Sequence, residues 1–387
     1  MSQPGYTGRH MSDTPRIHWT QDGTEHDALW RSEAAAPPPK RAVMADDRMA
    51  ADQAYKLACE GTALLWCGDF QNARHLLQAL TRRLDRKPGR NKPAPVPTAT
   101  QAFHNHRKVQ AQRAHILGSV LIPFEADHSI PLRRAPAAQQ ACQEAYGTSG
   151  ERYVTTLREL LGLIGAHEWR KKGVEIPALQ GRIHAHYGVF SPVRGEYVDL
   201  VAKAPLPDTS LAFDIGTGSG VLAAVLAKRG VQRIVATDQS DRALACAQDN
   251  LTRLKLQKQV DLQKVDLFPE GRAPLVVCNP PWVPAKPSSP IEYAVYDPDS
   301  AMLKGFLAGL AAHLTPGGEG WLILSDLAEH LGLRSRDELL GWIAQAGLTV
   351  KGRQDIRPRH PKATDASDPL HQARASEITS LWMLSAA

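Results

Sequence analysis

The chain has 387 residues, with 46 lysines and arginines against 40 aspartates and glutamates, a formal net charge of +6 and 43% hydrophobic residues. This length predicts two domains or one elaborated domain, and the composition excludes a fibre or a wholly disordered chain. The sequence contains no run of about 18 apolar residues that could span a membrane, and no signal peptide at its N-terminus. We therefore expect a cytoplasmic protein with no membrane contact.

The five cysteines are odd in number and form no CxxC pair. Such a set argues against a disulfide framework and against a structural zinc site. The histidines also lack the spacing of metal ligands, so we expect no metal. We interpret the cysteines as reduced packing residues: Cys59, Cys67, Cys142, Cys246 and Cys278.

The first half of the chain has a weak internal signal. Residues 1–48 are polar and irregular, which predicts a disordered tail. Residues 49–173 combine apolar residues at three- and four-residue spacing with short apolar runs. This pattern predicts an N-terminal accessory domain for substrate recognition, of mixed α/β or helical structure.

Positive charge is concentrated inside this accessory domain. Residues 71–120 carry ten lysines and arginines against Asp85 alone, so the block carries +9 while the whole chain carries +6. Such a block predicts a contact with a polyanion. A solvated helix face followed by a flexible linker at 87–98 is the alternative interpretation.

Strands and helices alternate from residue 174 to the end. This alternation predicts a parallel sheet with helices on both faces, because right-handed crossovers allow little else. We expect strands near 211–214, 233–238, 260–265, 275–278, 320–325, 350–355 and 378–384, and helices near 220–229, 241–254 and 301–314.

A glycine-rich turn follows the first of these strands. Ligands of such sheets bind beyond the carboxyl ends of the strands. The turn reads DIGTGSG over residues 214–220, and its glycines allow the backbone N–H groups to approach a ligand. Alone it is weak evidence, since a tight strand-to-helix connection looks the same. Its candidate cofactor contacts are Asp214, Gly216, Thr217, Gly218 and Gly220.

Carboxylates end the next two strands. Asp238 follows the turn by about twenty residues and can accept both hydroxyls of a ribose. A nicotinamide dinucleotide enzyme would have that feature too, but its turn reads GxGxxG, whereas this one reads GxGxG. The following strand ends in Asp266, Leu267 and Phe268. Asp266 suits the exocyclic amine of an adenine, with Leu267 beside it and Phe268 against the ring. A helix or turn cap is the alternative for Asp266.

The fourth strand runs into the segment NPPW. Its two prolines fix the backbone and remove two N–H donors, which leaves carbonyls that can only accept. The amide oxygen of Asn279 is a further acceptor, and Trp282 offers a flat face for stacking. Paired acceptors suit a substrate –NH₂ whose lone pair is to be aimed at an electrophile. The candidate catalytic residues are Asn279, Pro280, Pro281 and Trp282, and Asn279 is also a candidate cofactor contact.

Together, DIGTGSG, Asp238, Asp266 and NPPW resemble the class I S-adenosylmethionine-dependent N-methyltransferases. The resemblance covers roughly residues 180–387 and implies a methyltransferase domain over residues 174–387. It implies an α/β fold, a Rossmann-like seven-stranded sheet with its last strand reversed. It also implies S-adenosylmethionine as the cofactor. The methionine part would lie over Asp214 and the glycine turn, the ribose on Asp238 and the adenine near Asp266, while Asn279 and Pro280 would hold the target nitrogen. Transfer would be an in-line displacement without a metal.

Two subfamilies compete for the substrate. NPPW followed by Val-Pro looks like the protein methyltransferases that modify a glutamine amide in release factors, which usually carry Tyr at the fourth position. The GVFS segment just upstream of the first strand resembles the ribosomal RNA guanine-N2 methyltransferases, which usually carry Phe there. The candidate substrate contacts are Phe190 from GVFS, Trp282, and Tyr296 downstream.

The basic block favours RNA, because phosphate contacts supply most of the nonspecific affinity for it. We therefore predict transfer to a guanine N2 of ribosomal RNA. A protein glutamine is the first alternative, and small molecules remain open. An inactive, cofactor-binding scaffold is a further alternative, although the Asn-Pro-Pro segment is intact.

Overall fold

The computed structural model describes residues 15–86, 97–193, 195–287, 292, 294–358, 365 and 368–387. The chain divides into two compact units. The N-terminal unit comprises Met1–Ala94 and Lys108–His167, and the C-terminal unit comprises Pro95–Arg107 and Glu168–Ala387. The predicted boundary near residue 174 therefore lies close to the observed one, but a short segment from the first half belongs to the C-terminal unit.

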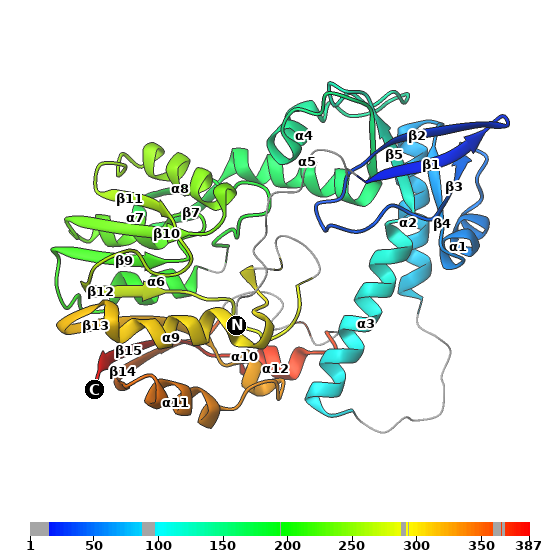
Figure 1. Cartoon of the computed structure of the whole chain (residues 1–387). Helices are drawn as coiled ribbons and strands as arrows, with labels where there is room; N and C mark the ends of the chain where they lie inside the picture. Colours follow the sequence, from blue (N-terminus) through cyan, green and yellow to red (C-terminus); the bar gives the residue numbers. More distant parts are fainter. Residues whose placement is uncertain are drawn as a thin grey trace. The chain divides into compact units, whose positions relative to one another are not determined.

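The N-terminal unit is built on a six-stranded sheet of order β1-β2-β6-β5-β4-β3 (Figure 1). Strands β3, β4 and β5 are parallel and are joined through helices, while β1 and β2 form an antiparallel hairpin. Of the two structures predicted for this unit, mixed α/β and helical, the structure has the mixed α/β one. The elements up to residue 172 are β1 (Arg16–Gln21), β2 (Thr24–Trp30), β3 (Arg41–Ala45), α1 (Ala51–Cys59), β4 (Thr62–Trp66), α2 (Phe70–Asp85), α3 (Ala99–Leu117), β5 (Val120–Phe124), α4 (Gln139–Tyr146), β6 (Tyr153–Thr156) and α5 (Leu157–Lys172). Helices α3 and α5 each have residues in both units.

The disordered tail predicted for residues 1–48 is wrong for its greater part. Residues 1–14 lie outside the described residues, but β1, β2 and β3 are all strands. Asp22 and Gly23 have positive φ angles of 51° and 76°, as a two-residue hairpin turn requires. Ile17 and Trp30 then pack against Leu65 of β4 in one cluster. The strands are therefore held by apolar partners that come later in the chain, which local composition does not reveal.

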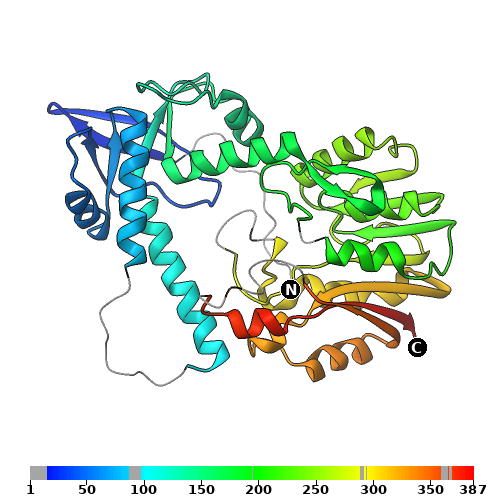
Figure 2. The same ribbon diagram turned by 180° about the vertical axis from the view of Figure 1, so that it is seen from behind.

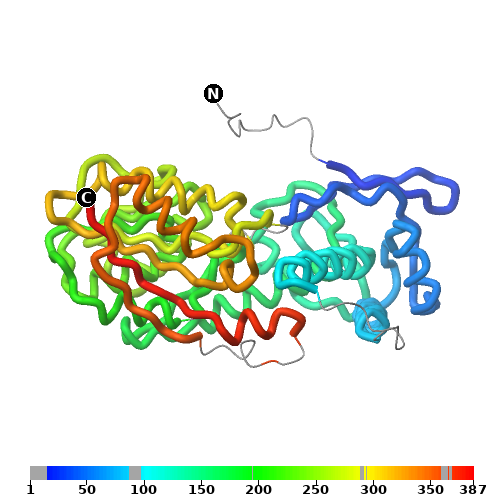
Figure 3. The backbone as a smooth tube through the Cα atoms, turned by 90° about the horizontal axis from the view of Figure 1, so that it is seen from below, coloured from blue at the N-terminus to red at the C-terminus, as the bar shows by residue number. Residues whose placement is uncertain are grey.

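The C-terminal unit holds a seven-stranded sheet of order β11-β10-β9-β12-β13-β15-β14 (Figure 1). Strand β15 is antiparallel to both neighbours, and Figures 2 and 3 show it running beside β14. The predicted sheet with a reversed last strand is confirmed. The strands are β9 (Leu211–Ile215), β10 (Arg233–Asp238), β11 (Val260–Lys264), β12 (Ala273–Cys278), β13 (Leu314–Ser325), β14 (Leu348–Ile356) and β15 (Thr379–Ala386), with a small hairpin of β7 (Val174–Ile176) and β8 (Gly181–Ile183) before them.

Helices cover both faces of this sheet because successive strand residues point to opposite sides. Ala212 packs in the cluster with α6 and α7, and Phe213 packs in the cluster with α9 and α11. The strands of such a sheet are buried on both faces. The helices are α6 (Glu196–Lys203), α7 (Val221–Lys228), α8 (Asp241–Arg253), α9 (Ala301–His313), α10 (Leu327–His330), α11 (Arg336–Gln345) and α12 (His371–Ser376).

Three of the cysteines are buried as predicted, but Cys59 and Cys67 are exposed, and all five are free. Within the described residues, no group of three or more His, Cys, Asp or Glu side chains is arranged to hold a metal ion. None of the helices in that part of the chain combines the length and hydrophobicity needed to cross a bilayer.

Candidate functional site

Parallel pairing brings the predicted site segments to one edge of the sheet. Strand β9 lies between β10 and β12, with Ile215 opposite Thr237 on one side and Cys278 on the other. The glycine turn, Asp238 and Asn279 follow these residues directly, so their backbones leave the sheet at the same edge. The sequence prediction of one shared site is consistent with this arrangement.

The glycine turn depends on backbone angles that suit glycine. Gly216, Gly218 and Gly220 all have positive φ, at 70°, 55° and 78°. A Cβ on Gly216 would lie 2.6 Å from Cε of Met302, and a Cβ on Gly220 would lie 3.1 Å from Cα of Ala247. A Cβ on Gly218 would meet no atom closer than 4.0 Å, the carbonyl oxygen of Gly216. The middle of the turn is therefore open, while its two ends are crowded.

Asp214 acts inside the turn. Its side chain is buried, and Oδ2 accepts hydrogen bonds from the Thr217 hydroxyl at 2.7 Å and from the Ala223 backbone N–H at 3.0 Å. Burial raises the pKa of Asp214 to about 6, although both hydrogen bonds favour the charged form. The carboxylate thus joins the turn to the start of α7, and direct contact with a cofactor stays a prediction.

Asp238 stands at the end of β10 with both carboxylate oxygens oriented by the backbone. Oδ2 accepts from the Gly218 N–H at 3.0 Å, and Oδ1 accepts from the Ser240 N–H at 2.9 Å. Burial raises its pKa above the usual Asp value. Each carboxylate oxygen has a second lone pair. The Gln239 N–H is a third backbone donor, so the carboxylate keeps room for a further donor, such as a ribose hydroxyl.

The segment after β11 fits its prediction in part. Asp266 is exposed, and Leu267 adopts a positive φ of 63°, held by the hydrogen bond from the Thr237 hydroxyl to its carbonyl oxygen at 2.6 Å. The predicted stacking of Phe268 on an adenine is wrong. Its ring stacks on His313 at 4.3 Å and on Phe306 at 5.8 Å, so α9 covers it.

The NPPW segment contains a side-chain hydrogen bond that the sequence does not predict. The indole N–H of Trp282 donates to Oδ1 of Asn279 at 2.9 Å. This oxygen is the acceptor predicted for the target nitrogen. Pro280, between them, is buried, and Trp282 is partly buried and packs against apolar clusters on both faces of the sheet.

Two of the predicted substrate residues have structural partners. Phe190 is partly buried and packs on the same cluster as Trp282. The ring of Tyr296 lies under the guanidinium of Arg107, 4.4 Å from its centroid. Asp297 accepts from the backbone N–H groups of Met302 and Leu303, so it starts α9. Tyr293, a further candidate for the substrate site from the sequence, lies outside the described residues.

Sequence reasoning missed Asn250 of α8. Its side chain is buried, with Nδ2 donating to the Ser219 carbonyl at 3.0 Å and Oδ1 accepting from the His184 N–H at 2.7 Å. One amide thus ties the glycine turn to the segment that leads into GVFS. A buried polar residue on an otherwise apolar helix face is the signal that could have identified it.

It also missed the first part of α3. Arg107 donates to the Lys286 carbonyl at 2.6 Å and pairs with Glu292 at 3.5 Å. Phe103 packs in a cluster with Val283. These α3 residues, Phe103 and Arg107, belong to the C-terminal unit and hold the segment that follows NPPW. A helix 170 residues away in sequence carries no local sign of this contact.

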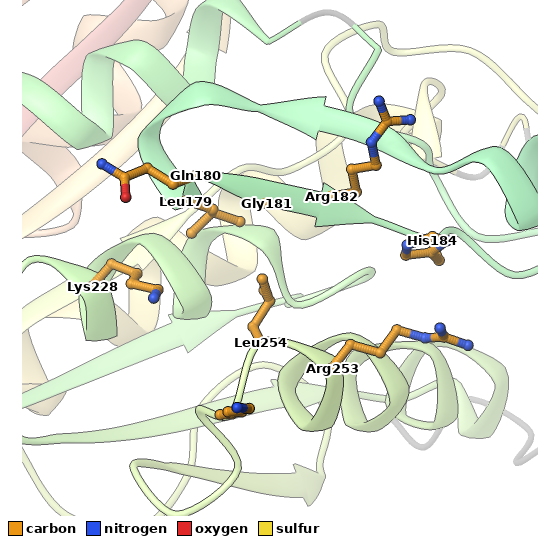
Figure 4. A pocket seen from close by; sticks show the side chains of 9 residues that line it. Leu179, Gln180, Gly181, Arg182, His184, Lys228, Arg253 and Leu254 are labelled. Carbon is orange, nitrogen blue, oxygen red and sulfur yellow. The ribbon is translucent and has the colours of Figure 1, made fainter.

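A hollow of about 700 Å³ lies elsewhere in the C-terminal unit and contains none of the predicted site residues (Figure 4). It lies at the carboxyl ends of α7 and α8, whereas the glycine turn precedes the amino end of α7. Basic side chains at helix carboxyl ends offset the helix dipole, which accounts for their presence. Its lining residues are Leu179, Gln180, Gly181, Arg182, His184, Lys228, Arg253, Leu254 and Lys255.

Comparison with known proteins identifies the C-terminal unit. Residues 180–336 match the family model of the methyltransferase small domain. The chain is 30% identical over 170 residues to a release factor glutamine methyltransferase of Cereibacter sphaeroides, covering 40% of this chain and 58% of that protein. It is 35% identical over 156 residues to one of Mycobacterium tuberculosis, covering 35% and 51%. It is 32% identical over 98 residues to a tRNA1(Val) (adenine(37)-N6)-methyltransferase of a Shewanella species, covering 24% and 42%.

The chain thus spans about half the length of the curated relatives it matches. The match lies within the unit that carries the seven-stranded sheet, the glycine turn and NPPW. Family model, relatives and sheet topology agree with the family that the motifs resemble. Residues 180–336 of the C-terminal unit therefore match the methyltransferase small domain, in agreement with the family that the motifs resemble.

Proposed function

We propose that this protein transfers a methyl group from S-adenosylmethionine to a planar amino or amide nitrogen, and that its substrate is a guanine N2 of RNA, ribosomal RNA first. The observation that carries the transfer is the position of the Asn-Pro-Pro acceptors at the same sheet edge as the glycine turn and Asp238. Such acceptors suit a nitrogen that needs aiming more than deprotonation.

The residues present fit the cofactor. The open space over Gly218 leaves room for a group close to the backbone, and the Asp238 carboxylate can accept from a ribose hydroxyl. Asp266 is exposed beside the same edge, where it can accept from an adenine amine. The cofactor supplies a methyl group on a sulfonium, an electrophile that needs no metal.

The protein's part in transfer is alignment. Asn279 Oδ1 and the Pro280 carbonyl would accept the two hydrogens of the target –NH₂ and direct its lone pair at the methyl carbon. The nitrogen–carbon bond forms as the carbon–sulfur bond breaks, the bonding pair stays on sulfur, and the nitrogen then loses a proton to solvent. Such alignment alone can supply a large part of the rate enhancement.

A line of arginines on α2 supports RNA as the substrate. Arg74 and Arg82 are exposed on α2 and lie eight residues apart, and Arg86 is exposed at the residue that follows the helix. Arg82 and Arg86 form no ion pair among the described residues, whereas Arg83 pairs with Asp52. Unpaired arginines in a row suit a phosphate backbone.

A protein glutamine amide is the second candidate. It is favoured by the relatives, two of which are release factor glutamine methyltransferases at 30% and 35% identity. Its amide nitrogen would make the same two hydrogen bonds. The basic α2 face has no evident use in this case, which is why we place RNA first.

Labelled S-adenosylmethionine tests both candidates. The enzyme is incubated separately with ribosomal RNA and with protein fractions from a cell that lacks it. We expect label in the RNA, at N2 of guanine after digestion. Label in protein alone would replace the RNA proposal by the second candidate. Label in neither fraction, from a chain that binds the cofactor, would leave a small-molecule enzyme or an inactive scaffold.

A further inference from the structure

We propose that Trp282 is a positioning residue of the transfer site: its indole N–H holds the side-chain amide of Asn279 with Oδ1 as the acceptor for the target nitrogen. This inference rests on the proposed function. It assigns to Trp282 a role apart from stacking, and it is carried by the 2.9 Å hydrogen bond from the indole nitrogen to Oδ1.

An asparagine amide has two ends of nearly equal size and opposite hydrogen-bonding character. Rotation by about 180° would present its –NH₂ group to the substrate, and that group cannot accept a hydrogen. An indole N–H is a donor only, so it selects the rotamer in which Oδ1 faces it. The oxygen keeps a second lone pair for one N–H of the substrate.

Trp282 is itself well held. It packs against three apolar clusters, formed around both faces of the sheet and around Phe103. Two prolines separate it from Asn279 and restrict the backbone between donor and acceptor. The hydrogen bond therefore joins two side chains whose backbones move little, which suits a device for orientation.

The residue type supports the same role. Phe and Tyr are the other side chains that could offer a flat ring at the position of Trp282. A Phe ring has no donor, and a Tyr hydroxyl lies at the far end of its ring, beyond the place of the indole nitrogen. All three provide a flat face, so stacking alone does not account for a tryptophan here.

The kinetic test uses Trp282→Phe, which keeps an aromatic face and removes the donor. We expect kcat to fall about tenfold, the usual size of one lost hydrogen bond, with KM changed less than about threefold. Trp342→Phe is the matched control: it is another partly buried tryptophan of this unit, and its indole makes no hydrogen bond to the described residues. It should leave kcat unchanged, and affinity for S-adenosylhomocysteine should be unchanged in both variants.

A double-mutant cycle separates positioning from a merely structural role. If Trp282 acts through Asn279, then Trp282→Phe should cost nothing further once Asn279 is Ala. Additive losses, or a wild-type kcat in Trp282→Phe, would overturn the proposal. Increased kcat would do so as well, because it would make the hydrogen bond a resting contact that competes with substrate.

A spectroscopic readout keeps this test apart from the proposed function. The indole N–H resonance of Trp282, assigned by its loss in Trp282→Phe, should shift in Asn279→Ala, and an unmoved resonance would overturn the hydrogen bond. A wild-type chain that shows this shift and binds S-adenosylhomocysteine, yet methylates neither RNA nor protein, would instead contradict the proposed function.

Discussion

At the scale of single residues, buried Asp214 and half-buried Asp238 differ in the groups that their carboxylates bind. Asp214 accepts from Thr217 and Ala223 and lies inside the turn, while Asp238 accepts from Gly218 and Ser240 and keeps lone pairs for a ligand. Burial raises the pKa of both. We expect the pH dependence of the two groups to differ. Titration of Asp238 should affect cofactor affinity, because Asp238 faces the proposed cofactor, whereas titration of Asp214 should affect stability, because Asp214 lies inside the turn.

Acid should weaken cofactor binding through Asp238. Protonation would replace an acceptor by a donor where the ribose hydroxyls bind, and the raised pKa moves this loss above the usual Asp value of 3.8. Affinity for S-adenosylhomocysteine, measured by calorimetry from neutral pH downward, should therefore decline well before an exposed Asp would titrate. Asp238→Asn should bind weakly with a flatter profile. A wild-type affinity that is constant down to about pH 4 would contradict the assignment.

The contribution of Asp214 to folding stability should fall as pH rises. Its folded pKa of about 6 exceeds the ordinary 3.8, so the native state binds more protons than the unfolded chain between these values. Its contribution to stability is therefore greatest below about pH 4, falls as pH rises to about 6, and is constant above that. In urea titrations, the unfolding free energies of wild type and Asp214→Asn should diverge by at most about 3 kcal/mol over this range. Parallel pH profiles would refute this.

At the scale of elements, the glycine turn combines two separable requirements. Gly220 has a positive φ of 78° and lies against α8, with only 3.1 Å from its ideal Cβ position to Ala247. Gly230, after α7, has a φ of 95° and open space around it. Substitution by alanine would strain the backbone at both positions, but the added Cβ would be crowded only at Gly220.

Gly220→Ala should therefore be more damaging than Gly230→Ala. Each loses roughly 1–2 kcal/mol through the left-handed backbone, and Gly220→Ala should lose about 1 kcal/mol more because α8 has to shift. Urea unfolding measures the difference, and affinity for S-adenosylhomocysteine should fall in Gly220→Ala alone. Equal stability losses would show that contact with α8 is not limiting.

The first part of α3 should control the segment after NPPW. Arg107 binds the Lys286 carbonyl and lies over Tyr296, so Arg107→Ala should loosen this segment. The Asp297 N–H donates to Val283, and its hydrogen exchange should rise by about tenfold for a loss near 1.4 kcal/mol. Arg113→Ala is the control on the same helix, since Arg113 pairs with Asp85 in the other unit. An unchanged exchange rate of the Asp297 N–H in Arg107→Ala would show that Arg107 does not hold the segment after NPPW.

At the scale of the whole molecule, the question is whether the uneven charge serves substrate binding. The double change Arg82→Gln, Arg86→Gln should weaken RNA binding and reduce the slope of log affinity against log salt by roughly 1.5 to 2. Lys203→Gln with Lys258→Gln removes the same charge from exposed sites of the C-terminal unit and should alter the slope little. Filter binding over a salt series measures both. Equal slopes in the two variants would remove α2 from the RNA contact.

Sequence by itself determined the C-terminal unit and the edge at which its site lies. Alternating apolar strands and helices predict one parallel topology, and glycines, prolines and carboxylates at strand ends carry their chemistry within a few residues. Such residues can be recognised from the local sequence alone, without knowledge of tertiary contacts. They located Asp238 and NPPW and reached the right seven-stranded sheet.

Tertiary structure alone decided the rest, because the deciding contacts join residues far apart in the chain. Local composition predicts a disordered tail where β1 to β3 lie, because the apolar partners of these strands are in β4 and β5. Phe268 was placed on a ligand, but α9 covers its ring. Arg107 reaches the segment after NPPW across more than 170 residues. Burial and side-chain hydrogen bonding depend on packing, and packing is a property of the folded chain.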